Sequence, residues 1–98
     1  GQKFRLLLSR ALAKKPEILI IDEGFSNIEP EKESFIMRSL KLNFPDMKII
    51  LISHRISSLQ FCDKILFIEN GIISGYSDYN NLIKENLNFK KLLNSEID

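Results

Sequence analysis

The chain has 98 residues, which is enough for one small domain and too few for two. Its hydrophobic content of 44% and charged content of 28% are typical of a globular protein and exclude a disordered or fibrous one. A net charge of +1, a single cysteine and short apolar runs give no global signal for nucleic-acid binding, an internal disulfide or a transmembrane helix.

The first expected element is an amphipathic helix over residues 3–15. Its apolar residues recur at helical spacing, two lysines complement the negative end of the helix, and Pro16 ends it. The next segment, residues 17–22, contains four consecutive aliphatic residues, 18–21, which lead into the carboxylates of Asp22 and Glu23. Such a run is typical of a strand that is buried on both faces, as in a parallel sheet.

A second helix and a second strand follow. Residues 24–29 form a polar turn, and Pro30 suits the first position of a helix whose first turn carries acidic residues. Pro45 ends this helix. The apolar segment 48–52 then predicts a second buried strand, which runs directly into the chain's single histidine, His54.

The last third of the chain predicts a hairpin and a terminal helix. A short helix leads to a third apolar strand, residues 65–68, and Asn70-Gly71 is a strong hairpin signal because both positions tolerate a positive φ. Ser77 or Asp78 can cap a final helical stretch. This order predicts an α/β fold with a parallel sheet flanked by helices, right-handed connections, a C-terminal antiparallel hairpin and a terminal helix.

Reactive side chains follow two of the predicted parallel strands. Asp22 and Glu23 end the first strand, and Ser53 and His54 follow the second. If these strands are neighbours, both sets lie at the edge where open α/β sheets bind ligands. An acid that holds Mg²⁺, an acid that orients a water and an imidazole that donates to an oxyanion suit phosphoryl transfer. The structural alternative is that the carboxylates mark an exit into a solvated loop and that His54 is a surface residue.

Several segments resemble the motifs of ABC-type ATPases, in the order and at the spacing of that family. Residues 18–23 resemble the Walker B strand, residues 26–29 the D-loop, and residues 52–55 the switch-histidine segment. Gly1-Gln2 with the basic helix after it resembles the tail of the signature motif, and residues 63–75 resemble the closing hairpin of exporter domains. The resemblance covers nearly the whole chain. It implies that residues 1–98 are the C-terminal part of an ABC exporter nucleotide-binding domain, with a partial P-loop NTPase-type sheet.

The resemblance also implies roles for single residues. Asp22 would hold Mg²⁺ through a water, Glu23 would polarise the attacking water, and His54 would donate a hydrogen bond to the γ-phosphate of ATP. Other positions would face ATP held by a second subunit or line the subunit interface: Gly1, Gln2, Ser26 and Glu29. The implied partners are a second nucleotide-binding domain, in an ATP-sandwich dimer, and an exporter's transmembrane domain at the cytoplasmic face of the cell membrane. No nucleic-acid partner is expected.

The sequence departs from the family pattern in three respects. Glu29 stands where the D-loop usually has aspartate, and Phe25 stands where the family commonly has a small or hydroxyl residue. No G-x-x-x-x-G-K-[ST] phosphate loop occurs in the 98 residues, and the glutamine loop and most of the signature motif are also missing. The isolated 98-residue chain is therefore expected not to hydrolyse ATP.

Three other interpretations stay open from the sequence. The head domain of a chromosome-maintenance or repair ATPase shares these motifs, and upstream coiled-coil heptads would favour it. A degenerate subunit that serves only for interaction would have a broken phosphate loop. A receiver-like signalling domain needs an earlier acidic pair and a lysine at the end of a later strand, whereas Lys64 lies at the start of its strand.

Overall fold

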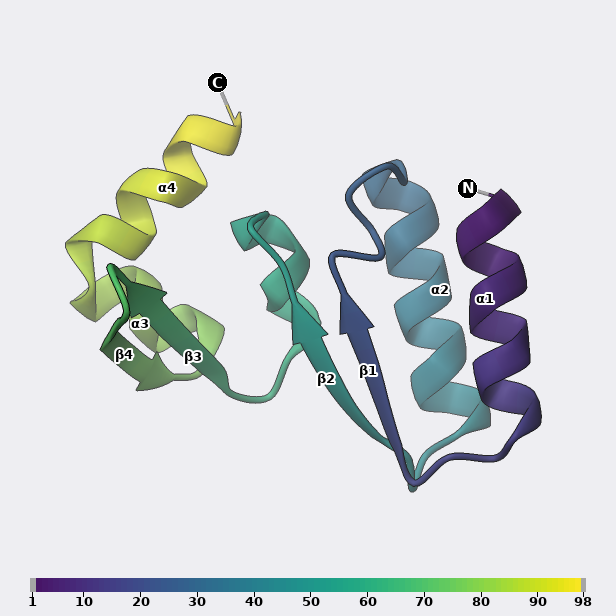
Figure 1. Ribbon diagram of the computed structural model, residues 1–98. Coiled ribbons are helices and arrows are strands. Elements are labelled where there is room, and N and C mark those ends of the chain that lie inside the picture. Colours follow the sequence, from purple (N-terminus) through teal and green to yellow (C-terminus); the bar gives the residue numbers. More distant parts are fainter. Residues whose placement is uncertain (1, 98) are drawn as a thin grey trace. The chain divides into compact units, whose positions relative to one another are not determined.

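The fold is described from a computed structural model of residues 2–97, without the side chain of residue 97. In chain order, the elements are α1 (Gln2–Ala13), β1 (Ile18–Asp22), α2 (Pro30–Asn43), β2 (Lys48–Ile52), the 3₁₀ helix η1 (Ile56–Phe61), β3 (Ile65–Glu69), β4 (Ile72–Ser77), α3 (Tyr79–Glu85) and α4 (Leu87–Ile97) (Figure 1). They form two compact units, one up to His54 and one from Arg55 onward. The parallel strand pair, the antiparallel hairpin and the terminal helices confirm the predicted fold class. No helix within residues 2–97 combines the length and the apolarity that a membrane crossing requires.

The first unit contains the parallel pair of β1 and β2, with α1 and α2 on one side of the sheet (Figure 1). Alternate residues of β1, Leu19 and Ile21, are buried in its core. The opposite face of the sheet is 46–62% exposed at Ile18, Ile20, Ile50 and Ile52. The prediction that the first strand is buried on both faces is therefore wrong for the described residues, because both helices of this unit cover the same face.

The second unit contains an antiparallel hairpin in which β3 pairs with β4. Asn70 has a φ of 51° and Gly71 a φ of 77°, so both turn residues adopt the left-handed region that the Asn-Gly pair predicts. Within residues 2–97 the parallel sheet contains only β1 and β2, whereas the third predicted strand lies in this second sheet. A two-residue turn returns the chain directly alongside β3, which dictates antiparallel pairing with β4.

The terminal helical stretch is divided in two at Asn86. Of the two predicted candidates, Ser77 and Asp78, it is Asp78 that caps α3, since its Oδ1 accepts the backbone N–H of Asn81 at 2.8 Å. Asn86 then has an extended backbone, and its Oδ1 accepts the N–H of Phe89 at 3.0 Å, which caps α4. Its Nδ2 also donates to the carbonyl of Ser74 at 3.2 Å. These bonds compete with a continuous helix and explain the break.

Tyr79 provides a test of packing in the second unit. Its ring lies edge-on to the fully buried Phe89, with centroids 6.0 Å apart. Burial, with a smaller contribution from the Glu96 carboxylate, raises the pKa of the Tyr79 phenol above its usual value of 10.0. Because the folded-state pKa is the higher one, the stability that this group contributes is fully present below about pH 10 and is lost as the pH rises through the folded-state pKa.

We therefore expect the melting temperature of the wild type to fall more steeply above about pH 10 than that of Tyr79→Phe, which has no phenol to ionise. Thermal denaturation of the complete protein between neutral and alkaline pH measures the difference. Tyr76→Phe is the matched control because it removes an exposed phenol (66% exposed). Equal alkaline slopes for Tyr79→Phe and the wild type would contradict the expectation.

Candidate functional site

The candidate site lies at the carboxyl ends of β1 and β2. The two strands pair in parallel, in a continuous register that ends with Asp22 opposite Ile52. The backbone N–H of Glu23 donates to the carbonyl of Ile52 at 2.9 Å, which extends the ladder by one residue. The predicted adjacency of the two strand ends is thus confirmed, and the residues that follow them share one edge of the sheet.

Two of the titratable side chains at this edge contact each other. Oε1 of Glu23 contacts Nδ1 of His54, and this contact is an ion pair when the imidazole is protonated. The carboxylate side chain is 33% exposed and its Oε1 atom is buried, whereas the imidazole is 94% exposed. The imidazole is therefore accessible from solution, and it contacts the carboxylate oxygen that solvent does not reach. A carboxylate that accepts protons and an imidazole that donates hydrogen bonds are the groups that general acid–base chemistry requires.

The backbone of Glu23 adopts a conformation that is unusual for this residue type. Its φ is 57°, in the left-handed region, which costs a non-glycine residue about 1–2 kcal/mol. Its N–H is bonded to Ile52, and its carbonyl accepts the N–H of Ser26 at 3.2 Å, so the strain coincides with a tight turn. Strained backbone that the surrounding structure maintains is typical of functional sites.

The burial of Phe25 offsets this strain. Its side chain is 2% exposed, and its ring lies edge-on to Phe4 of α1, with centroids 5.2 Å apart. Burial of an aromatic ring contributes about 1.5–3 kcal/mol, and an edge-to-face pair adds about 0.5–1.5 kcal/mol. These contributions exceed the cost of the left-handed residue. They also give Phe25, which departs from the family pattern, a structural role that sequence reasoning missed.

Gly24 is required by the same packing. A Cβ atom built on Gly24 would lie 2.4 Å from Cε1 of Phe4 and 2.9 Å from Cγ2 of Ile21, which is closer than real Cβ contacts. The Phe4 ring therefore lies directly against the backbone between Glu23 and Phe25. The available sequence signal was the aromatic Phe25 directly after Gly24 in a turn that otherwise consists mostly of polar residues.

Asp22 is the position from which a metal ion could be held. It is the last residue of β1, is exposed, and lies on the same face of the strand as Ile18 and Ile20. Within residues 2–97 no group of three or more potential metal ligands occurs. Mg²⁺ usually binds one or two carboxylates and takes its other ligands from waters and substrate phosphates. A single exposed carboxylate therefore fits Mg²⁺ that arrives with a phosphate substrate.

The other predicted site residues lie near this edge or at the start of a helix. Ser26 is exposed in the turn after Glu23, and Glu29 is exposed at the N-cap of α2, where its side chain makes no capping hydrogen bond. Gln2 is exposed at the start of α1, and the Phe4–Phe25 contact brings that end of α1 against the turn. Gly1 lies outside the described residues.

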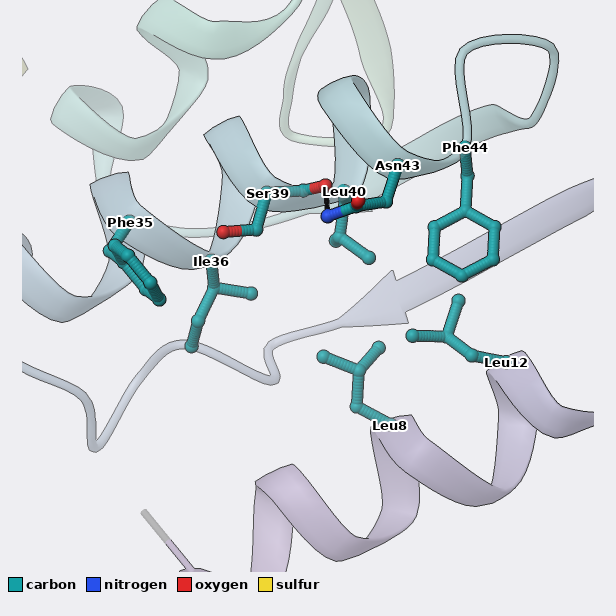
Figure 2. A pocket seen from close by; sticks show the side chains of 8 residues that line it. All are labelled: Leu8, Leu12, Phe35, Ile36, Ser39, Leu40, Asn43 and Phe44. Atoms are coloured by element: carbon teal, nitrogen blue, oxygen red, sulfur yellow. Dashed lines mark hydrogen bonds between the residues drawn. The ribbon is translucent and has the colours of Figure 1, made fainter.

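An apolar pocket between α1 and α2 is separate from this edge (Figure 2). Its lining residues are Leu8, Leu12, Phe35, Ile36, Ser39, Leu40, Asn43 and Phe44. The lining contains no charged side chain, and Nδ2 of Asn43 donates to the carbonyl of Ser39 within α2 at 2.9 Å. The pocket therefore offers no group for acid–base chemistry.

Comparison with known proteins finds ABC transporter and export proteins among the relatives of this chain. The chain is 33% identical over 97 residues to a multidrug resistance ABC transporter ATP-binding and permease protein of Lactococcus lactis. It is 40% identical over 86 residues to the microcin-J25 export ATP-binding/permease protein of Escherichia coli, and 34% identical over 92 residues to the ATP-dependent lipid A-core flippase of Haemophilus influenzae. These matches cover 99%, 88% and 94% of this chain, and 16%, 15% and 16% of the relatives. No family model matches the sequence.

A solved structure supports the fold. The structure of a bacterial Atm1-family ABC exporter with ATP bound superimposes on this chain with a TM-score of 0.92. The match covers 100% of this chain and 17% of the exporter chain, at 24% sequence identity.

Proposed function

We propose that this chain, which belongs to the ABC exporter ATP-binding/permease proteins, supplies the hydrolytic half of an ATPase site that drives export. It corresponds to the C-terminal part of their nucleotide-binding domain. The contact between Glu23 and His54, at the edge where two parallel strands end, carries this proposal. The chain spans 15–16% of the length of the three relatives compared above. ATP hydrolysis and transport are therefore proposed for the complete transporter.

In the proposed reaction, Glu23 acts on the attacking water. Its carboxylate accepts a hydrogen bond from the water and takes its proton as the water oxygen approaches the γ-phosphate. General-base assistance of this kind contributes about 10²–10⁴-fold in rate. The buried Oε1 atom and the contact with His54 support this role, because each limits the positions that the carboxylate can take.

His54 stabilises the charge that develops on the phosphate. Its Nδ1 contacts Glu23, so its exposed Nε2 is the nitrogen left to donate a hydrogen bond to a γ-phosphate oxygen. Both nitrogens donate at once only when the imidazole carries two protons, and the Glu23 carboxylate then supplies the counter-charge. A donor aimed at developing negative charge lowers the barrier to phosphoryl transfer.

Bound Mg²⁺ would neutralise negative charge on the ATP phosphates. Asp22 is the residue that would hold it, through a water, from the end of β1. The exposure of Asp22 supports this role because a hydrated ion needs space at the carboxylate.

Three exposed positions suit an interface with a second nucleotide-binding domain, with ATP held between the two. Gln2 would face the ATP bound by the other subunit, and Gly1 is proposed for the same surface. Ser26 and Glu29 would line the subunit contact. The absence of a capping bond from the Glu29 side chain supports this, since its carboxylate is not engaged by α2. The second partner proposed is the transmembrane domain of an exporter, at the cytoplasmic face of the membrane.

The 98 residues alone are proposed to be inactive. They contain no phosphate loop, so the backbone cradle and the lysine for the β- and γ-phosphates must come from elsewhere in the transporter. The exposed isoleucines on one face of the parallel sheet support a larger domain whose other parts cover that face. The export relatives favour a transporter over the head domain of a chromosome-maintenance ATPase.

The Mg²⁺ dependence of ATP hydrolysis tests this function. We expect Asp22→Asn to raise the Mg²⁺ concentration for half-maximal activity by about 10–100-fold, because removal of a residue that orients a metal's ligands weakens metal binding by that factor. The measurement is phosphate release by the complete purified transporter over a Mg²⁺ titration. Asp46→Asn is the matched control because Asp46 is exposed and precedes the opposite end of β2. An unchanged Mg²⁺ requirement in Asp22→Asn would remove Asp22 from the site.

A further inference from the structure

The turn that carries Glu23 rests on an aromatic pair. Of the residues from Glu23 to Glu29, only Phe25 and Ile28 are buried, and Ser26 and Asn27 between them are exposed. Phe25 makes its edge-on contact with Phe4, at an interplanar angle of 60°. The buried side chain nearest to Glu23 along this turn is therefore held by a residue of α1.

The backbone on both sides of Glu23 is restrained. On the strand side, the Glu23 N–H is bonded to the carbonyl of Ile52. On the turn side, the Phe4 ring lies so close to Gly24 that no Cβ atom fits between them. A left-handed φ is unfavourable for a glutamate, so contacts that hold the neighbouring backbone in place help to maintain it. The Phe4 ring and the buried Phe25 are the contacts that do so on the turn side.

From these observations we propose that Phe4 and Phe25 are positioning residues for ATP hydrolysis. Their ring pair maintains the left-handed conformation of Glu23 and so keeps its carboxylate against His54. Neither ring touches the reacting atoms; both act through the backbone of the turn. The inference rests on the proposed function, since it assigns the pair a role in the reaction of that site.

The test uses steady-state ATP hydrolysis by the complete transporter. We expect Phe25→Leu to lower kcat about 10-fold and to leave the KM for ATP within about 2-fold, because the catalytic carboxylate is displaced while ATP-binding groups are untouched. Phe89→Leu is the matched control. Phe89 is buried and has its own edge-on partner, Phe67, with centroids 5.3 Å apart, but its unit contains none of the proposed site residues. It should lose thermal stability as Phe25→Leu does, with kcat retained.

A steric double variant distinguishes positioning from general destabilisation. Gly24→Ala places a Cβ where the Phe4 ring lies and should lower kcat about 10-fold. Phe4→Leu removes the closer of the two clashes and leaves the one with Cγ2 of Ile21, so the double variant Gly24→Ala/Phe4→Leu should be at least as active as Gly24→Ala alone. If the loss of kcat in the double variant equals the product of the losses in Gly24→Ala and Phe4→Leu, the two substitutions act independently and the positioning role is wrong.

The outcomes separate this inference from the proposed function. Full activity in Glu23→Gln would overturn the proposed function itself. An inactive Glu23→Gln variant together with an unchanged kcat in Phe25→Leu would overturn only the positioning role. A rise in KM as large as the fall in kcat in Phe25→Leu would also overturn it, because the pair would then support the ATP site as a whole.

Discussion

Replacement of Glu23 by glutamine should lower kcat for ATP hydrolysis by the complete transporter about 10²–10⁴-fold, the contribution expected of a general base. The amide has nearly the same shape as the carboxylate but cannot accept a proton from the attacking water. The KM for ATP should change little, because Glu23 is not proposed to bind ATP in the ground state. Phosphate release measures kcat, and binding of a fluorescent ATP analogue shows whether the site remains intact.

Glu17→Gln serves as the control for this substitution. Glu17 is exposed and immediately precedes β1, at the opposite end of the strand from Glu23, so the same loss of charge occurs away from the site. Glu23→Asp is expected to retain an intermediate kcat, since it keeps the carboxylate but withdraws it by one methylene group from His54. If Glu23→Gln kept kcat within a few-fold of the wild type, Glu23 could not be the general base.

The local elements of this fold could be predicted because specific residues mark their ends. Pro30 occupies the start of α2, Asn70 and Gly71 adopt the left-handed turn, and Asp78 caps α3, each as its side-chain or backbone chemistry requires. These signals depend on interactions within a few residues along the chain. They can therefore be recognised without knowledge of the tertiary structure.

The nonlocal features were predicted less well. An apolar run such as residues 18–21 predicts a strand, but the number of its buried faces depends on which elements cover it. The same limit applies to β3, whose partner is β4 and not a strand of the parallel sheet. The break at Asn86 was also missed, because the bond from its side chain to Ser74 joins residues that are twelve positions apart.

The candidate site could be predicted only in part from the sequence. It could be predicted that Asp22 and Glu23 share an edge of the sheet with His54, because two adjacent parallel strands place their carboxyl ends together. The left-handed backbone of Glu23 and its support by Phe25 could not, because the pattern of residue types does not show which ring fills the space beside Gly24. Chemistry at a strand end is visible in a sequence, but the packing that orients it is not.

Removal of the imidazole should have the second-largest effect. We expect His54→Ala to lower kcat about 10²–10³-fold, the cost of deleting one hydrogen-bond donor from a developing oxyanion. His54→Gln should lose less, because its amide can still donate. Arg55→Ala is the neighbouring control: Nε of Arg55 donates to Oγ of the buried Ser58 at 3.2 Å, so this variant should lower thermal stability and retain kcat.

The combined loss of both site residues tests whether Glu23 and His54 act as one unit, as their contact indicates. When two residues act together in catalysis, the losses of kcat in their single variants do not add up in the double variant. The kcat of Glu23→Gln/His54→Ala should therefore be only a little below that of the less active single variant. Phosphate release under identical Mg²⁺ and ATP concentrations compares the three variants directly. A double variant whose loss equals the product of the single losses would mean that the two side chains serve the reaction independently.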